Sequence, residues 1–242
     1  MEEYMGEALP LENGVIARTA LLRQILAAQK ILEAHSPERV IVFGGDCLVS
    51  QAPFAYLNEK YGGKLGVLWL DAHPDVSTPE MHGHVHAMVL GNLLGEGDSA
   101  FAAQVKVKLN PKLVMYGGLQ KMSQEEDAIV NRLALRRVGP TALAESSAPV
   151  LEWVKENQIS HLAIHLDLDV LNPSLFRSLL FAEPGGEPID SPSGEMTLDQ
   201  IARLIQDVSK LTDVVGLAIA EHLPWDAINL GSFMSALPIF HQ

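Results

Sequence analysis

Residues 66–75 read GVLWLDAHPD. The unbroken apolar run at 67–70 is typical of a strand buried on both faces of a parallel sheet, and such strands deliver functional groups just beyond their carboxyl ends. Three possible metal ligands, Asp71, His73 and Asp75, follow directly at a spacing of two. Carboxylate oxygens and imidazole nitrogens together suit hard or borderline divalent ions, so the stretch predicts a metal site. A polar loop that happens to contain Asp and His is the alternative for this stretch alone.

A second apolar stretch carries another pair of acidic residues. Residues 161–173 read HLAIHLDLDVLNP, and Asp167 and Asp169 fall on one face at strand spacing. Like charges this close repel, which raises the pKa of a carboxyl group or costs stability unless a cation is shared. The two stretches together therefore predict a metal site at one end of a parallel sheet, and they weaken the metal-free alternative.

Five short motifs, in order along the chain, resemble those of a known family. They are GGDC at 44–47, DAHPD at 71–75, HAM at 86–88, LDLDVLNP at 166–173 and GLAIAEHLP at 216–224. This ordered set resembles that of the ureohydrolase family, which includes arginase, agmatinase and formimidoylglutamase. The resemblance implies a doubly wound parallel α/β sheet, the arginase-like three-layer α/β/α fold. It also implies a binuclear metal centre, usually manganese, that hydrolyses C–N bonds of guanidino or amidino compounds, the linear amidines.

The resemblance further assigns a set of metal ligands. By this resemblance Asp71 and Asp167 bridge the two ions. Cys47 and Asp75 complete the ligands of one ion, and His73 and Asp169 complete those of the other. A hydroxide bridging two ions about 3.5 Å apart would attack the amidine carbon.

Four residues outside the metal ligands receive roles by the same resemblance. His86 matches a histidine that moves protons, and its ordinary pKa near neutrality suits that task. Glu221 matches a glutamate that grips a guanidinium or amidinium by charge-assisted hydrogen bonds, and it is expected in both catalysis and substrate binding. Ser77 and Glu187 are further expected substrate contacts. The implied partner is thus a small cationic guanidino or amidino compound.

Several positions depart from the family pattern. Cys47 stands where histidine is usual, and its soft sulfur suits zinc, iron or nickel at a site where manganese is otherwise expected. Ala218 stands where relatives such as arginase carry an aspartate, and Ala87 replaces a glycine. Ser123 falls near the arginase residue that holds the amino group of the substrate, and Glu187 near a threonine of the substrate loop, which disfavours L-arginine. The alternative to an active hydrolase is a non-catalytic or weakly active metal-binding or assembly protein.

Three histidines, His82, His84 and His86, recur at a spacing of two before the apolar run at 88–94. They could bind a metal themselves, or form a surface cluster. A helix is expected to begin within or just after them.

Composition bounds the remaining possibilities. The 242 residues, 48% hydrophobic, suit a single α/β domain spanning 1–242. Seventeen basic against thirty acidic residues give a net charge of -13, which disfavours nucleic acid and anionic membranes as partners. One cysteine, the absence of a signal-like start and the absence of a long apolar run predict a cytoplasmic protein without a membrane span.

Strands and helices are expected to alternate, as in a parallel doubly wound sheet. Residues 1–14 are expected to be irregular and 172–197 to form a substrate loop rich in Pro and Gly. Only 43 residues precede the GGDC motif, so the family's first strand is expected to be missing; the uncovered edge predicts a homo-oligomer, a trimer or hexamer. Strands are expected at 40–43, 67–70, 113–116 and 214–220, and within 161–173, where the strand is expected to end in Asp167 and Asp169. Helices are expected at 15–35, 50–61, 88–94, 124–135, 148–157, 197–211 and 229–240.

Overall fold

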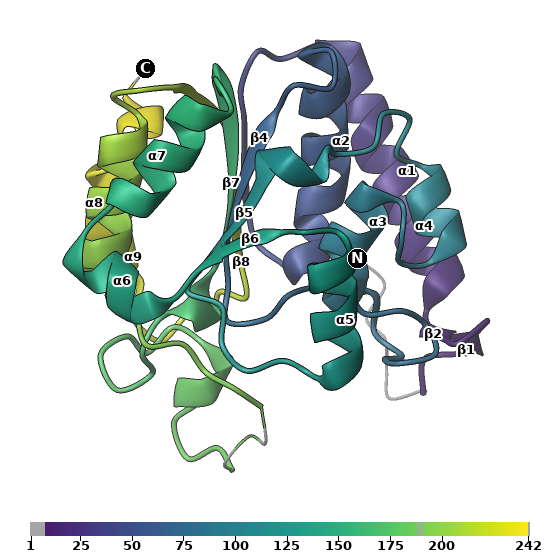
Figure 1. Cartoon of the computed structure of the whole chain (residues 1–242). Helices are drawn as coiled ribbons and strands as arrows, with labels where there is room; N and C mark the ends of the chain where they lie inside the picture. Colours follow the sequence, from purple (N-terminus) through teal and green to yellow (C-terminus); the bar gives the residue numbers. More distant parts are fainter. Residues whose placement is uncertain (1–7, 188, 190, 242) are drawn as a thin grey trace.

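A six-stranded parallel sheet divides the computed structural model, which describes residues 8–187, 189 and 191–241. The strand order is β3-β8-β7-β4-β5-β6, and helices cover both faces, with α1 to α5 on one side and α6 to α9 on the other (Figure 1). The prediction of a doubly wound three-layer α/β/α fold is confirmed. The strands of the sheet are β3 (Val40–Phe43), β4 (Gly66–Leu70), β5 (Val114–Gly117), β6 (Arg136–Val138), β7 (His161–Asp167) and β8 (Asp213–Ala220).

Nine helices cover this sheet in the described part of the chain. Three of them, α4, α5 and α8, begin after a residue whose side chain accepts hydrogen bonds from backbone N–H groups of the first turn. The α5 and α8 helices start with capping boxes, at Ser123 with Glu126 and at Thr197 with Gln200. The helices are α1 (Arg18–His35), α2 (Gln51–Lys60), α3 (Val89–Leu94), α4 (Ser99–Ala103), α5 (Gln124–Arg132), α6 (Pro140–Glu145), α7 (Ala148–Glu156), α8 (Leu198–Val208) and α9 (Ala227–Ser235).

The two faces of the central strands feed two separate cores, because successive side chains on a strand point to opposite sides. On β4, Leu68 and Leu70 pack into the core beneath α7 and α8, whereas Val67 and Trp69 pack into the core beneath α2 and α3. The central strands β4 and β7 are buried along almost their whole length. These rigid central strands end at the site.

Three parts of the chain differ from the sequence prediction. Residues 11–16 form a small antiparallel hairpin, β1 (Leu11–Glu12) and β2 (Val15–Ile16), where irregular chain and the start of a helix were expected. Its turn is Asn13-Gly14, both with positive φ (50° and 80°), the preference of a two-residue hairpin turn. The α1 helix consequently begins at Arg18.

The expected helix at 124–135 stops at Arg132, and the edge strand β6 and the helix α6 follow it. The β6 strand was not predicted because its two arginines, Arg136 and Arg137, are exposed and ion-paired to Glu156 and Asp127. Charged side chains on an edge strand are a common protection against unwanted pairing.

The expected final helix at 229–240 instead ends at Ser235. A short 3-10 helix, Pro238–Phe240, follows it, because a proline lacks the N–H that an α-helix needs.

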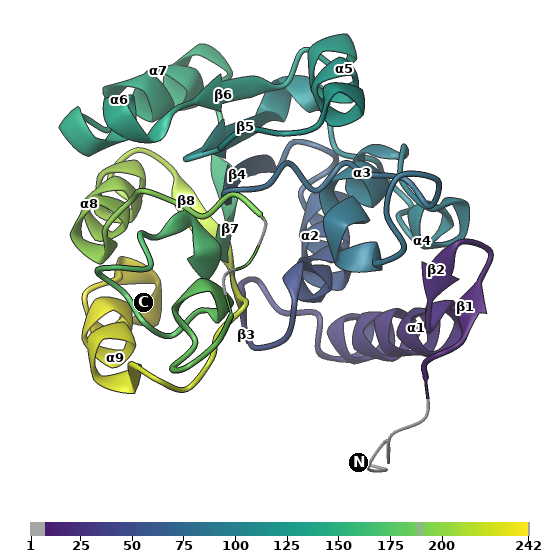
Figure 2. The same ribbon diagram turned by 90° about the horizontal axis from the view of Figure 1, so that it is seen from below.

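Loops gather at the carboxyl ends of the strands, which face the viewer in Figure 2. The long loop at 172–197 is tied to the chain after β7 by backbone hydrogen bonds from Gly194 N to Asp169 O (2.7 Å) and from Met196 N to Val170 O (3.1 Å). A Cβ at Gly194 would overlap the Val170 carbonyl, so the close approach requires glycine. Among the described residues, no helix combines the length and apolar character needed to cross a membrane.

Candidate metal centre and its cavity

The end of β4 turns so that three side chains meet. Asp71 Oδ1 accepts a hydrogen bond from His73 N (2.7 Å), and Asp71 Oδ2 accepts one from the indole Nε1 of Trp69 (3.0 Å). Asp75 adopts a positive φ of 50°, unusual for a residue with a side chain, and is buried. The turn therefore brings the DAHPD side chains back over the strand end.

The end of β7 supplies the second pair of carboxylates and joins them to the first. Asp167 Oδ1 accepts from Asp169 N (2.7 Å), and Asp169 Oδ1 accepts from Ala72 N (3.2 Å). Adjacent pairing of β4 and β7 makes this contact possible, since neighbouring parallel strands end at the same edge.

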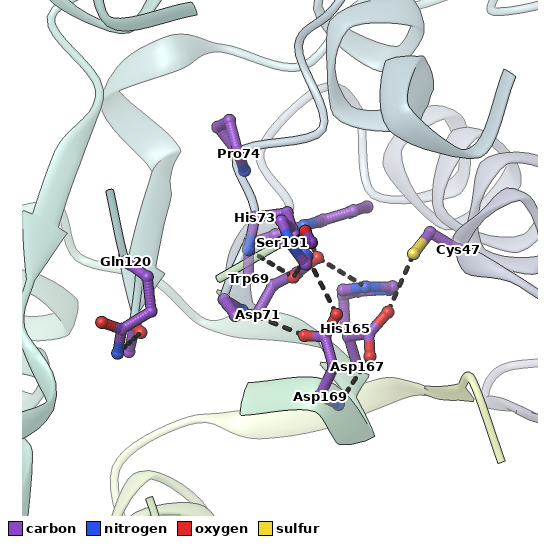
Figure 3. Close-up of polar contacts among 12 residues, drawn as sticks. Cys47, Trp69, Asp71, His73, Pro74, Gln120, His165, Asp167, Asp169 and Ser191 are labelled. Atoms are coloured by element: carbon purple, nitrogen blue, oxygen red, sulfur yellow. Dashed lines mark hydrogen bonds and ion pairs between the residues drawn. The ribbon is translucent and has the colours of Figure 1, made fainter. Parts of the chain in front are cut away.

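Two groups of side chains converge closely enough to hold metal ions (Figure 3). In the first group, the Cys47 thiol donates to Asp167 Oδ2 at 2.9 Å. In the second, His73 Nδ1 lies 2.9 Å from Asp169 Oδ2. Within each group one donor atom per residue lies within 4.8 Å of all the others: Cys47, Asp71, His165 and Asp167 in the first group, and Asp71, His73 and Asp169 in the second.

Asp71 belongs to both groups, whereas Asp167 belongs only to the first and Asp75 to neither, and the bridging roles of Asp71 and Asp167 stay predictions. Asp75 is nevertheless suited to a cation, because its Oδ2 is buried and has no hydrogen-bond partner in the described part of the chain. The sequence-predicted ligands thus lie together, and the pairing of Cys47 with Asp75 stays a prediction.

The site concentrates negative charge in a buried place. Burial raises the pKa of both Asp75 and Asp167 well above the ordinary value. The negative charges of Asp71 and Asp169 raise both pKa values further. Burial would also raise the pKa of Asp71, but the His165 and His73 imidazoles outweigh burial and lower it. Carboxyl groups that resist ionisation when buried are stabilised as ligands by divalent ions, so this donor set fits a metal.

His73 is held between carboxylates on one side and the long loop on the other. Burial alone would lower the pKa of His73, but Asp169 and Asp71 raise it to about 12. Its Nδ1 faces Asp169, and its Nε2 lies 3.0 Å from Ser191 Oγ. A hydroxyl on the far ring nitrogen is the kind of contact that orients a ligating histidine.

A cavity of about 400 Å³ opens above these ligands. Glu221, just beyond β8, lines it in a left-handed conformation (φ 59°), and its N–H donates to the Gly45 carbonyl (2.9 Å). Burial raises the pKa of Glu221 to about 7, and Asp46, Asp169 and Asp71 contribute in the same direction. A cation in the cavity would favour the ionised carboxylate.

His86 also lines the cavity, and its side chain is 38% exposed. Burial lowers its pKa, the neighbouring His82 and His84 lower it further, and Asp46 at 3.9 Å opposes them. The centroids of the three rings lie 5.3 to 5.7 Å apart. Among the described residues, their nitrogens do not form a group of close donor atoms like the two metal groups. His82 and His84 are exposed, in keeping with the surface-cluster alternative.

The expected substrate contacts fall in different places. Ser77 is buried, lines the cavity and donates to Glu126 Oε1 (2.6 Å), while Ser123 lines the cavity as the cap of α5. Glu187 is exposed in the long loop and does not line the cavity, so its role stays a prediction. Lys121, which the sequence did not single out, lines the cavity as well.

His165 is the residue of the metal groups that the sequence prediction missed. It lies on β7 two positions before Asp167, is fully buried, and stacks on Trp69 with ring centroids 3.7 Å apart. The period of two along the strand was the available signal, since it places positions 165 and 167 on one face. The sequence prediction gave His165 no role, since it lies inside the apolar run of the strand.

Comparisons with known proteins were consistent with this geometry. The sequence model of the Arginase family matches residues 7–232. An arginase of Entamoeba histolytica is 26% identical over 196 residues, covering 76% of this chain and 62% of that protein. An arginase of Bacillus caldovelox is 30% identical over 188 residues, which cover 70% of this chain and 61% of that protein. The chain therefore spans less than two thirds of the length of these curated relatives.

Solved structures share the fold at low sequence identity. Entamoeba histolytica arginase, in complex with L-ornithine, gives a TM-score of 0.79 at 19% identity, covering 96% of this chain and 80% of that one. Formimidoylglutamase from Bacillus subtilis gives a TM-score of 0.63 at 18% identity, and the match covers 89% of this chain and 63% of that one. These likenesses are to the arginase fold.

The raised pKa values predict how the metal-free protein responds to pH. Asp75, Asp167, Asp169, Glu221 and His73 all have raised pKa values, so above about pH 5 the folded state holds more protons than the unfolded chain. Stability should therefore fall as pH rises from about 5 to 8. The lowered pKa of Asp71 acts in the opposite sense only at more acidic pH.

Thermal unfolding of chelator-treated protein across this range measures the effect, and Asp167→Asn should reduce the slope. Reloading with divalent metal should reverse it, because the ligands must lose protons to bind. A metal-free protein that gains stability with rising pH would contradict the charge arrangement.

Proposed function

The chain belongs to the arginase family, and from that premise we propose that it is a metal-dependent hydrolase acting on a C–N bond of a small guanidino or amidino compound. The main support is spatial: two carboxylate-rich metal groups and Glu221 meet at one cavity at the end of the sheet. Neither the end of β4 nor the end of β7 alone would supply all the residues of these metal groups.

Metal binding is the first part of the proposal. Divalent ions held by Asp71, Asp167, Asp169, His73 and Asp75 would supply an activated water and positive charge for attack on a planar amidine carbon. Oxygen and imidazole ligands suit manganese, whereas the Cys47 thiol admits zinc, iron or nickel in the group it belongs to.

Glu221 and His86 would handle the substrate. A carboxylate with a raised pKa binds a cationic amidinium favourably, because the pairing recovers the energy lost by burying its charge. His86, whose lowered pKa keeps its ring neutral around neutral pH, can accept a proton and pass it to a leaving amine. The surface of the cavity thus offers both charge recognition and proton transfer.

Substitution of these two residues should have different effects. Glu221→Gln should raise KM and lower kcat, because the ionic contact both orients the substrate and stabilises developing charge. His86→Asn should lower kcat by about a hundredfold with a smaller change in KM. His84→Asn, a change at an exposed neighbour that does not line the cavity, is the matched control and should leave kcat near the unmodified value.

Release of urea or ammonia from a panel of guanidino and amidino compounds provides the assay, and metal content is measured on the same preparations. Unchanged turnover in both variants, with metals retained, would place the chemistry elsewhere. No turnover with any compound would favour the second candidate, a non-catalytic metal-binding member of the family, for which the thiol of Cys47 in the metal group is the supporting feature.

Lys121 suggests which substrates to try first. It lines the cavity together with Glu221, and within the described ranges no ion pair or side-chain hydrogen bond involves it. A substrate with an amidinium at one end and a carboxylate at the other would satisfy both charges. Guanidino acids and formimino acids have this form, and agmatine-like compounds do not.

Lys121→Gln should therefore raise KM for guanidino or formimino acids by about tenfold, the effect of losing one exposed ionic contact of about 1.4 kcal/mol. KM for an agmatine-like compound should stay level or fall. Lys112→Gln, a surface change outside the cavity, is the control. An equal rise for both classes of substrate would contradict a carboxylate-binding role.

The outer edge of β3 supports self-association. Within the described ranges no strand pairs with this edge, and Ile41 and Phe43 are 40% and 48% exposed. An apolar cavity of about 430 Å³ lies between α1 and β3. Open apolar edges of a sheet favour pairing with another chain.

Light scattering at micromolar concentration should report a homo-oligomer, with a trimer or hexamer as the expected form. The double variant Ile41→Lys, Phe43→Lys should shift the protein towards the monomer. Ile228→Lys, at an apolar residue on α9 that is 84% exposed, provides the control and should leave the mass unchanged. A stable monomer of the unmodified chain would contradict the prediction.

A further inference from the structure

We propose that the Nε2 atom of His165 is a metal ligand, and that with Cys47, Asp71 and Asp167 it forms a zinc-type site of mixed sulfur, nitrogen and oxygen donors. The inference rests on the metal-binding part of the proposed function and is independent of the reaction. It gives the two metal groups different chemistry, one with sulfur and the other with oxygen and imidazole only.

The position of His165 on its strand points its ring at the ligands. His165 and Asp167 are two residues apart on β7 and share a face, and Trp69 is the register partner of His165 on β4. The indole of Trp69 stacks on the imidazole at an angle of 15° and also donates to Asp71 Oδ2. One aromatic side chain therefore fixes both a carboxylate and the imidazole beside it.

The two ring nitrogens of His165 have different surroundings. Nδ1 lies 2.7 Å from Ser50 Oγ. The buried Nε2 has no hydrogen-bond partner among the residues that the structure describes, and it lies 3.5 Å from Asp71 Oδ2. If Nδ1–H donates to the serine hydroxyl, the lone pair of Nε2 faces the carboxylates, where a proton would otherwise be expected. A buried unpaired nitrogen is costly, and a bound cation removes that cost.

Packing also favours an imidazole at this place. On the other side of β7, the register partner of His165 is Ala218 on β8, whose short side chain leaves room for the ring. The chain departs from the family pattern at both Cys47 and Ala218, and both adjoin the metal group of His165. The three residues together describe one altered site.

The donor set matches zinc in number and in chemical type. Four donors around zinc, at bond lengths of 2.0 to 2.3 Å, lie roughly 3 to 4 Å apart, and the four here are within 4.8 Å of one another. Binding would therefore draw the four donors closer together. On binding, the Cys47 thiol loses the proton that it now donates to Asp167, and that proton passes to solvent.

Cobalt(II) provides a direct test on the unmodified protein, since it occupies zinc-type sites and is visible spectroscopically. A thiolate-to-cobalt charge-transfer band should appear. Two coordinated histidines, His73 and His165, should give paramagnetically shifted imidazole N–H resonances. With the metal on Nε2, the proton of His165 would lie on Nδ1, where burial and Ser50 would protect it from exchange. One shifted imidazole instead of two would overturn the assignment.

Variants supply the second test. His165→Asn should weaken binding of one zinc ion by about a hundredfold or more and remove one shifted resonance, while the other ion remains. Ser50→Ala should weaken the same ion by about tenfold, because it removes the group that orients the ring. His161→Asn, at the other end of β7 where the ring stacks on Tyr61, is the matched control.

Zinc affinity and stoichiometry, measured by calorimetry with folding checked by circular dichroism, separate the outcomes. Unchanged zinc affinity in folded His165→Asn would refute the proposal. Loss of the cobalt charge-transfer band in that variant would also refute it if both shifted imidazole resonances remained, because His165 would then account for neither resonance. These readouts need no substrate. Failure to find turnover would therefore bear on the proposed reaction and leave the ligand assignment standing.

Discussion

Repulsion among four buried aspartates at the ends of β4 and β7 is the constraint on which the rest of the site depends. The carboxylates of Asp71, Asp75, Asp167 and Asp169 are brought together by the pairing of the two strands, which the apolar cores on both faces hold rigid. Charges gathered this closely in a buried place are stable only with protons or cations among them. The surrounding histidines and the thiol of Cys47 make sense as parts of that compensation.

The strand ends and most of the candidate site could be predicted from the sequence because they depend on local patterns. Apolar runs that stop at acidic residues identify β4 and β7, and the period of two places Asp167 and Asp169 together. The residues expected in the site meet there, apart from Glu187, which is exposed outside the cavity. Their detailed grouping depends on distances that no spacing in the sequence provides.

What the sequence did not reveal depends on contacts between distant segments. His165 looked like an interior residue because only the fold shows Ser50 at one nitrogen and Asp71 near the other. Lys121 follows a strand without any motif, and only the cavity gives it a meaning. The β6 strand was hidden because its exposed arginines are paired with residues of neighbouring helices, so its pattern is polar. The Asn13-Gly14 turn, by contrast, was a local signal that the sequence did contain.

The loop at 172–197 has a consequence for how such a protein can evolve. Its Gly194 N–H is bonded to the backbone of Asp169, and its Ser191 hydroxyl lies against His73, so the segment expected to choose the substrate also supports two ligands. New specificity through this loop is therefore easiest to acquire at 180–187, before these contacts, where Leu180 and Phe181 line the cavity and residues 183–187 are exposed. Changes at its second half would alter recognition and metal retention at once, which couples two properties that selection could otherwise adjust separately.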